Sequence, residues 1–188
     1  MNLKELQAKN GYTTDKDTTH SYLEPYDELF ARYQHQAVKL LEIGNNGGES
    51  IKLWDDYFDN VEITGIEINV LEPLKELNKR ENVNIHMGVD AYADATFERF
   101  RDTGVKYDII IDDGSHLPNH QAYALARWIE LLTDDGLMVV EDIQDYELIQ
   151  QLVTFIKPEL NKYIKIYDRR SIKGRFDDIL IVVDKGNK

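Results

Sequence analysis

The chain has 188 residues, which suits one domain built around a single hydrophobic core. Asp and Glu (35) outnumber Lys and Arg (22), and the formal charge of −13 disfavours nucleic acids and anionic membranes as partners. Cysteine is absent, no secretory apolar region follows Met1, and no apolar run approaches membrane-spanning length. We therefore expect a soluble, cytoplasmic protein without disulfides or thiolate chemistry.

Residues 1–37 are predicted to form an N-terminal helical and lid segment that precedes the main domain at 38–188. Residues 2–9 form a short amphipathic pattern, and Pro25 is typical of the first turn of a helix that continues to about residue 37. Between them, residues 11–22 are polar and rich in Thr, Asp and Gly. This stretch suits either a surface connection or an active-site lid.

From residue 38 onward, short apolar strands alternate with helical patterns. Strands are predicted at 38–44, 61–67, 83–88, around 109–111 and at 136–140, with helices at 49–58, 71–80, 94–100, 119–132 and 146–156. Two further strands, 163–167 and 179–183, are joined by a link too short for a helical crossover, so the last strand is expected to run antiparallel. The pattern predicts an α/β fold with a doubly wound, Rossmann-like sheet.

The turn after the first strand, Gly44-Asn45-Asn46-Gly47-Gly48, is rich in glycine and precedes a helix. Glycines there let the backbone approach a ligand closely. The dinucleotide fingerprint would need glycines where Asn46 and Glu49 stand, and a P-loop would need lysine in place of Glu49. The turn therefore favours a ligand without a strongly anionic group beside it.

Two acids follow the next two strands. Glu67 ends the second strand, about 20 residues beyond the glycine turn, where an acid typically accepts hydrogen bonds from ribose hydroxyls. Asp90 follows the third strand and suits contact with an adenine amino group. A solvated strand end for Glu67 and a helix cap for Asp90 are the alternatives.

The most pointed pattern is two clusters of acids at the ends of neighbouring strands. Asp112, Asp113 and His116 follow the fourth strand, and Glu141 and Asp142 follow the fifth. Oxygen ligands of this kind suit Mg²⁺, which lowers the pKa of a bound hydroxyl. An imidazole nearby suits a general base. For either cluster alone, helix capping and a surface histidine are the simpler interpretation, whereas their pairing favours a metal site.

Taken in order, Glu42-x-Gly44-x-x-Gly47-Gly48, Glu67, Asp90 and the terminal antiparallel strand resemble the class I S-adenosylmethionine-dependent methyltransferases. The resemblance implies the strand order 3-2-1-4-5-7-6. It also implies that the glycine loop holds the methionine moiety, Glu67 the ribose and Asp90 the adenine. The predicted cofactor-binding set is Glu42, Gly44, Asn46, Gly47, Gly48, Ser50, Glu67, Ile68, Asp90, Ala91 and Asp112.

A narrower resemblance is to metal-dependent sugar O-methyltransferases of the mycinamicin type. The chain shares with them Asp-Asp-Gly-Ser-His at 112–116, Glu-Asp-Ile at 141–143 and an upstream Thr-Asp-Lys-x-x-x-His-x-Tyr at 14–22. This implies Mg²⁺ ligation by Asp113 and Asp142, with Glu42 as a candidate third ligand, and His116 as general base. The upstream segment is expected to fold over cofactor and acceptor, and the predicted substrate and lid residues are His20, Tyr22 and Glu141.

Two departures from that family bear on the acceptor. Ser21 stands where glycine is usual, and the larger N-terminal region of the macrolide enzymes is missing, so the acceptor is expected to differ. The favoured function is metal-assisted transfer of a methyl group to a hydroxyl of a sugar or glycosylated small molecule. A non-sugar acceptor and a non-catalytic cofactor-binding module are alternatives, and a homo-oligomer is possible.

Two other enzyme classes fit less well. An N-methyltransferase of DNA or RNA would need Pro-Pro-aromatic after the fourth strand, where the chain has Asp-Gly-Ser. A nicotinamide-dependent oxidoreductase is disfavoured by the missing glycines.

Overall fold

A computed structural model describes residues 1–186, so the last two residues of the predicted domain 38–188 lie outside the described residues. Over the described residues, one sheet has seven strands in the order β3-β2-β1-β4-β5-β7-β6. The predicted strand order is therefore confirmed. The strands are β1 (Ala37–Ile43), β2 (Asn60–Glu67), β3 (Val83–Met87), β4 (Tyr107–Asp112), β5 (Leu132–Val140), β6 (Ile164–Asp168) and β7 (Ile179–Asp184).

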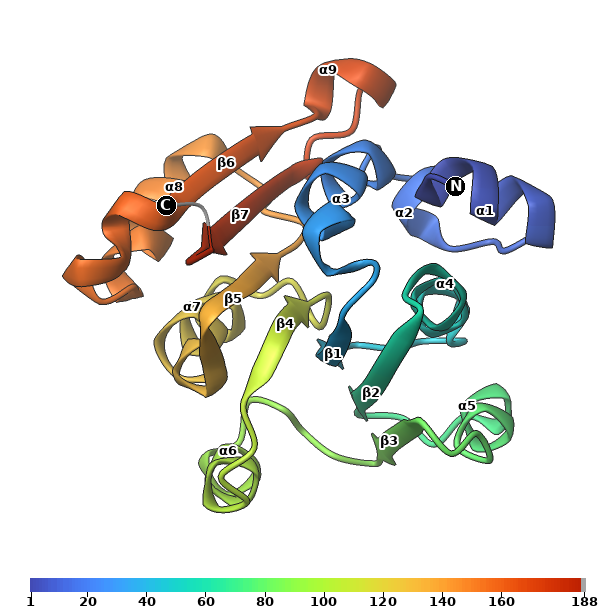
Figure 1. Cartoon of the computed structure of the whole chain (residues 1–188). Coiled ribbons are helices and arrows are strands. Elements are labelled where there is room, and N and C mark those ends of the chain that lie inside the picture. The colour runs from blue at the N-terminus through green and yellow to red at the C-terminus, as the bar shows by residue number, and fades with distance from the viewer. Residues whose placement is uncertain (187–188) are drawn as a thin grey trace.

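The central strands are parallel, and β7 is antiparallel to both of its neighbours, β5 and β6. The long hairpin predicted for the last two strands is thus confirmed (Figure 1). Its connection contains one short helix, α9 (Arg170–Lys173), which is far shorter than the helix of a parallel crossover.

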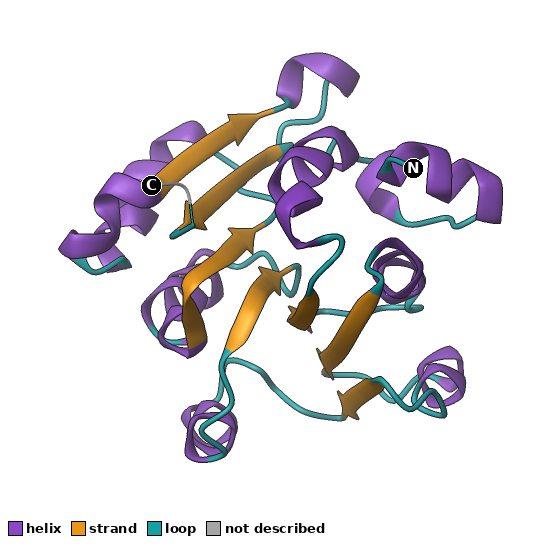
Figure 2. Ribbon diagram, viewed as in Figure 1, coloured by secondary structure: helices purple, strands orange, loops and turns teal. Residues whose placement is uncertain are grey.

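Helices cover both faces of the sheet (Figure 2). One face packs against α1 (Leu3–Asn10), α3 (Leu23–Phe30), α4 (Glu49–Tyr57) and α5 (Glu72–Leu77). The other packs against α6 (Asp94–Asp102), α7 (Pro118–Ala126) and α8 (Tyr146–Leu152). Successive residues of a strand serve opposite layers: Leu40 belongs to the first core and Leu41 to the second. The predicted doubly wound Rossmann-like fold is confirmed.

The N-terminal segment differs from its prediction in two ways. The helix from Pro25 ends earlier: α3 gives way to a 3₁₀ turn, Ala31–Tyr33, and Ala37 already pairs with Asn60 in the sheet. The three residues that follow Tyr33 are Gln34, His35 and Gln36, all polar, so they offer no apolar contact to extend the helix along the core. The polar stretch also contains a short helix, α2 (Asp15–Thr18), which precedes α3 in the chain (Figure 1).

Three smaller elements complete the described chain. The helix predicted at 119–132 is divided into α7 and a 3₁₀ turn, Trp128–Leu131, and Leu132 begins β5. Likewise α8 continues as a 3₁₀ turn, Val153–Phe155, and a further 3₁₀ segment, Pro158–Tyr163, leads into β6. None of the helices among residues 1–186 combines the length and apolarity needed to cross a lipid bilayer.

Candidate active site

The site lies where the parallel strands β1, β4 and β5 end. Ile43 pairs with Asp112, and Asp112 pairs with Val140, so these three strands finish in register. The glycine turn and the two acidic clusters therefore leave the sheet at the same edge, as in other open α/β sheets.

A cavity of about 660 Å³ opens at this edge. Of the predicted site residues it is lined by Gly44, Asn46, Gly47, Ser50, Glu67, Ile68, Asp90, Ala91, Asp113 and His116. It is also lined by residues that the sequence reasoning did not single out as ligands, including Thr13, Thr14, Asp15, Asn45, Tyr92 and His120. The remaining predicted site residues, Glu42, Gly48, Asp112, Glu141, Asp142, His20 and Tyr22, are not among the lining residues.

The glycine turn has a backbone that ordinary residues adopt rarely. Gly44 and Gly48 have φ values of 81° and 82°, and Asn46 has a φ of 42°. A Cβ atom on Gly44 would lie 2.0 Å from the carbonyl oxygen of Asp113. Glycine at this position therefore lets the cofactor turn and the loop after β4 lie against one another.

Glu67 fixes the glycine turn from the neighbouring strand. One carboxylate oxygen accepts hydrogen bonds from the backbone N–H groups of Asn45 (3.0 Å) and Asn46 (2.9 Å). The other accepts from the backbone N–H of Asn69 at 2.9 Å. Glu67 also lines the cavity, so the residue that shapes the turn is part of the cavity wall.

The far wall of the cavity comes from the loop after β3. Asp90 is exposed and accepts a hydrogen bond from the backbone N–H of Tyr92 at 2.9 Å, within a turn. The next helix, α6, begins at Asp94 with Ala93 as its N-cap, so the helix-cap alternative for Asp90 is wrong. The Tyr92 hydroxyl donates to Asp112 Oδ1 at 2.6 Å, and its ring stacks on His120 with 4.1 Å between centroids. Asp112 thus supports this wall from below the cavity surface.

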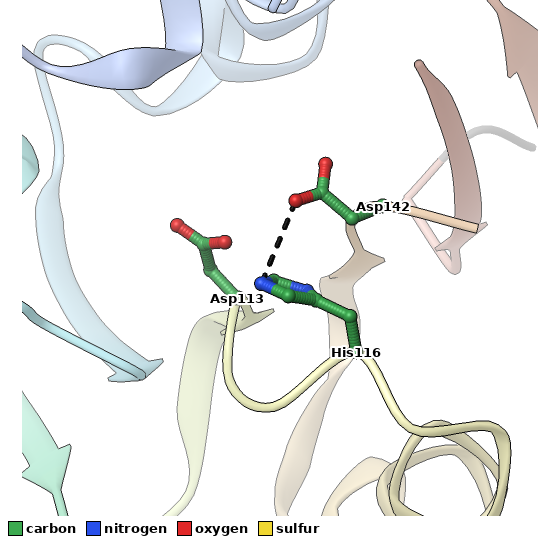
Figure 3. Close-up of side chains that lie close together, drawn as sticks. All are labelled: Asp113, His116 and Asp142. Atoms are coloured by element: carbon green, nitrogen blue, oxygen red, sulfur yellow. Dashed lines mark ion pairs between the residues drawn. The ribbon is translucent and has the colours of Figure 1, made fainter. Parts of the chain in front are cut away.

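Asp113, His116 and Asp142 lie close together (Figure 3). Asp113 and His116 line the cavity, whereas Asp142 beside them is not among its lining residues. Each offers a ligand atom within 4.8 Å of the others, and His116 Nε2 lies 3.5 Å from Asp142 Oδ2. Among the described residues, the only non-glycine residues with positive φ are Asn46, His116 and Asp142, all at this site. Strained backbone of this kind is typical of functional positions.

The clearest omission of the sequence reasoning is Lys16. Its side chain is 1% exposed, and its Nζ lies 2.6 Å from Asp113 Oδ2, 2.6 Å from Glu141 Oε1 and 3.6 Å from Glu42 Oε1. The sequence signal was available, since Lys16 belongs to the upstream motif. However, the two nearest partners, Asp113 and Glu141, lie 97 and 125 residues away along the chain, which hides their proximity.

Two further residues of the upstream motif support Asp142 from beneath. The Tyr22 hydroxyl donates to Asp142 Oδ1 at 2.7 Å, and His20 Nδ1 lies 3.3 Å from the same oxygen. His20 Nδ1 also lies 2.8 Å from Asp178 Oδ1, a fully buried carboxylate. His20 and Tyr22 are both buried, so contact between either side chain and an acceptor stays a prediction.

Glu42 and Glu141 also lie below the cavity. Glu42 is fully buried and accepts hydrogen bonds from the Ser50 hydroxyl at 2.9 Å and from Trp54 Nε1 at 3.4 Å. Glu141 accepts from Lys16 and from the Tyr26 hydroxyl. Glu42 therefore contacts both Ser50 of α4, which lines the cavity, and the ammonium group of Lys16.

Burial governs the ionisation of this cluster. It raises the pKa of Glu42 to about 7, against the opposing effect of Lys16. Burial, together with the charge of Asp113, raises the pKa of Glu141 well above its usual value, and burial also raises the pKa of Asp113. Burial alone would lower the pKa of Lys16, yet Asp113, Glu141 and Glu42 together raise it well above the ordinary value, so Lys16 stays charged.

Comparison with known proteins places this geometry in context. No family model matches the chain. The chain is 31% identical over 150 residues to 8-demethyl-8-alpha-L-rhamnosyl tetracenomycin-C 2'-O-methyltransferase of Streptomyces olivaceus, covering 76% of this chain and 38% of that protein. It is 30% identical over 149 residues to mycinamicin VI 2''-O-methyltransferase of Micromonospora griseorubida, covering 75% of this chain and 36% of that protein.

Among solved structures, the MycE methyltransferase of mycinamycin biosynthesis in complex with Mg, SAH and mycinamycin VI matches with a TM-score of 0.66 and 28% identity. This match covers 76% of the chain and 37% of MycE. The chain has the class I methyltransferase fold. The resemblance of this chain to mycinamicin-type sugar O-methyltransferases is confirmed, and the chain spans 38% and 36% of the length of the two curated relatives.

Proposed function

We propose that the protein transfers a methyl group from S-adenosylmethionine to a hydroxyl of a sugar or glycosylated small molecule, assisted by Mg²⁺. The observation that carries this proposal is the grouping of Asp113, His116 and Asp142, of which Asp113 and His116 line the same cavity as the glycine turn. The proposed cofactor site and the proposed metal ligands therefore lie next to one another.

The cavity suits the cofactor. Gly44 and Gly47 leave the turn without side chains beside the cavity, which lets a ligand approach the backbone. Glu67 offers carboxylate oxygens where ribose hydroxyls are expected, and Asp90 lies on the wall proposed for the adenine. In this proposal Asn46, Ser50, Ile68 and Ala91 complete the lining.

The donor set suits a divalent cation. Asp113 and Asp142 supply hard carboxylate oxygens and would hold Mg²⁺, which often takes only one or two protein carboxylates. When bound, Mg²⁺ supplies Lewis acidity that lowers the pKa of an acceptor hydroxyl and fixes its oxygen.

His116 is the proposed general base. Its Nε2 lies 3.5 Å from Asp142 Oδ2, within the same group of side chains as Asp113. The acceptor hydroxyl would give its proton to Nε2 as its oxygen becomes a nucleophile. The imidazole lies at the cavity wall, where it is accessible to that hydroxyl.

A sugar-bearing acceptor is proposed because the similar proteins are named for O-methylation of a rhamnosyl group and of mycinamicin VI. The net charge of −13 is consistent with a small-molecule acceptor rather than a nucleic acid, and we propose that the protein acts in the cytoplasm. In this proposal the part of residues 1–37 that acts as a lid is Thr13, Thr14 and Asp15, which line the cavity, whereas α1 and α3 belong to the core.

The decisive test has two parts. Isothermal titration calorimetry with S-adenosylhomocysteine should show saturable binding, and its absence would refute the cofactor assignment. Methyl transfer from labelled S-adenosylmethionine to a panel of rhamnosides and other glycosides should then be lost with EDTA and restored by Mg²⁺. Transfer that is insensitive to EDTA would refute the metal role while leaving the methyltransferase intact.

A further inference from the structure

The segment Thr14–Tyr22, here called the support segment, lies beneath the acidic cluster and contributes some of its most buried polar groups. Lys16, His20 and Tyr22 are 0%, 5% and 0% exposed. Thr14 begins α2 and accepts a hydrogen bond from the backbone N–H of Lys16 through its side chain. The backbone N–H of Tyr22 donates to the carbonyl oxygen of Lys16 at 2.9 Å, which closes the segment into a compact loop.

The support segment contacts one of the two carboxylate oxygens of each proposed metal ligand. Lys16 Nζ donates a hydrogen bond to Oδ2 of Asp113 at 2.6 Å. The Tyr22 hydroxyl occupies Oδ1 of Asp142, at 2.7 Å, while the other oxygen of Asp142 faces His116. Each carboxylate is therefore held by one oxygen from below, which leaves its second oxygen for a cation.

The supporting groups are themselves fixed. The Tyr22 hydroxyl also lies 3.0 Å from the carbonyl oxygen of Asp177, and His20 stacks on the Tyr22 ring with 4.8 Å between centroids. His20 Nδ1 lies 2.8 Å from Asp178 Oδ1. These contacts connect the support segment to the start of β7, so the orientation of Asp142 depends on two distant parts of the chain.

Packing alone does not require a charge here. A methionine would fill nearly the same volume as Lys16, whereas burying an ammonium carries a large desolvation cost unless it is well paired. Lys16 is paired with two acids at 2.6 Å and a third at 3.6 Å. A buried cation with this many partners fits the role of residues behind a metal site, which orient the ligands and tune their charge.

We propose that Lys16 is a positioning residue of the metal site. With the Tyr22 hydroxyl, its ammonium group holds one oxygen of each ligating carboxylate, so that the free oxygens of Asp113 and Asp142 face the same point. This inference rests on the proposed metal-assisted function. It also assigns Tyr22 to the support of Asp142 rather than to direct contact with the acceptor.

The test compares K16M with wild type and with K4M, a matched change at an exposed lysine of α1. Mn²⁺ replaces Mg²⁺ because its binding can be followed by electron paramagnetic resonance. K16M should weaken Mn²⁺ binding by about 10- to 100-fold, the usual cost of losing a group behind a metal ligand. Affinity for S-adenosylhomocysteine should fall much less, and kcat should fall while the acceptor KM stays near that of wild type.

Three outcomes decide the matter. A folded K16M protein with wild-type Mn²⁺ affinity overturns the proposal, as does equal weakening by K4M. A wild-type protein that binds neither Mn²⁺ nor S-adenosylhomocysteine refutes the proposed function instead, so the two failures are distinguishable. If circular dichroism shows that K16M does not fold, Y22F decides, because it removes one hydroxyl and keeps the ring: weakened Mn²⁺ binding supports the proposal, and unchanged binding overturns it.

Discussion

The glycine turn and the acidic cluster lie at the same edge of the sheet but are held in different ways. At the turn, Glu67 bonds residues that are 21 and 22 positions away, and Ser50 bonds Glu42 at a separation of 8. In the cluster, Lys16 reaches partners 97 and 125 positions away. The glycine turn is thus held within one strand-helix-strand unit, whereas the acidic cluster needs the ends of β4 and β5 together with the N-terminal segment.

This comparison predicts that chemistry and cofactor binding can be separated by mutation. H116A should lower kcat by about two to four powers of ten, because a positioned base is lost. Affinity for S-adenosylhomocysteine, measured by calorimetry, should stay close to wild type because the glycine turn is untouched. H35A, at a side chain that is 75% exposed, is the control. Unchanged turnover of H116A would remove the imidazole from the mechanism.

The substitution G44A should weaken both cofactor binding and metal binding. In G44A, holding an alanine in the left-handed backbone of Gly44 costs ~1–3 kcal/mol. The methyl group of that alanine would lie 2.0 Å from the carbonyl oxygen of Asp113, so the turn and the loop after β4 must move apart. We expect a lower melting temperature and weaker binding of both S-adenosylhomocysteine and Mn²⁺. Loss of only one of the two affinities would contradict the close contact between the regions.

Glu42 joins the two regions, and its ionisation offers a test by pH. Burial raises its pKa from 4.5 to about 7 in the folded protein, so the folded state holds the proton more tightly than the unfolded chain. The contribution is fully present below pH 4.5 and is lost as the pH rises through about 7. In metal-free buffer, the free energy of unfolding should fall by at most about 3 kcal/mol from this group across that window.

Urea denaturation of wild type and E42Q between pH 4.5 and 8 measures this effect. The pH dependence of E42Q should be flatter, since glutamine cannot titrate and the other acids of the cluster are common to both proteins. Parallel curves for the two proteins would show that Glu42 keeps an ordinary pKa.

The strand pattern was sufficient for the fold class and for the grouping of Asp113, His116 and Asp142, because these depend on where apolar strands begin and end. The strand order came from the family resemblance. The sequence was insufficient for the support beneath these three side chains. Lys16 is a charged residue in a polar stretch, which by composition alone predicts exposure, yet tertiary contacts bury it completely. The early end of the helix after Pro25 was missed for a related reason: strand pairing at Ala37, which is not a local property, decides where that helix stops.

The smallest predicted effect tests whether the cofactor end is independent. E67Q keeps the shape of the side chain but turns one acceptor oxygen into a donor, so one set of backbone N–H partners, Asn45 and Asn46 or Asn69, faces an amide group. Losing a hydrogen bond to a charged group costs ~1.5–3 kcal/mol, which corresponds to roughly a tenfold or greater loss of S-adenosylhomocysteine affinity in calorimetry. Mn²⁺ binding in the absence of cofactor should not change, because none of these contacts reaches the carboxylates that Lys16 and Tyr22 support. If E67Q weakened both affinities equally, the two ends of the site would be one cooperative unit, and the separation drawn from their contacts would be wrong.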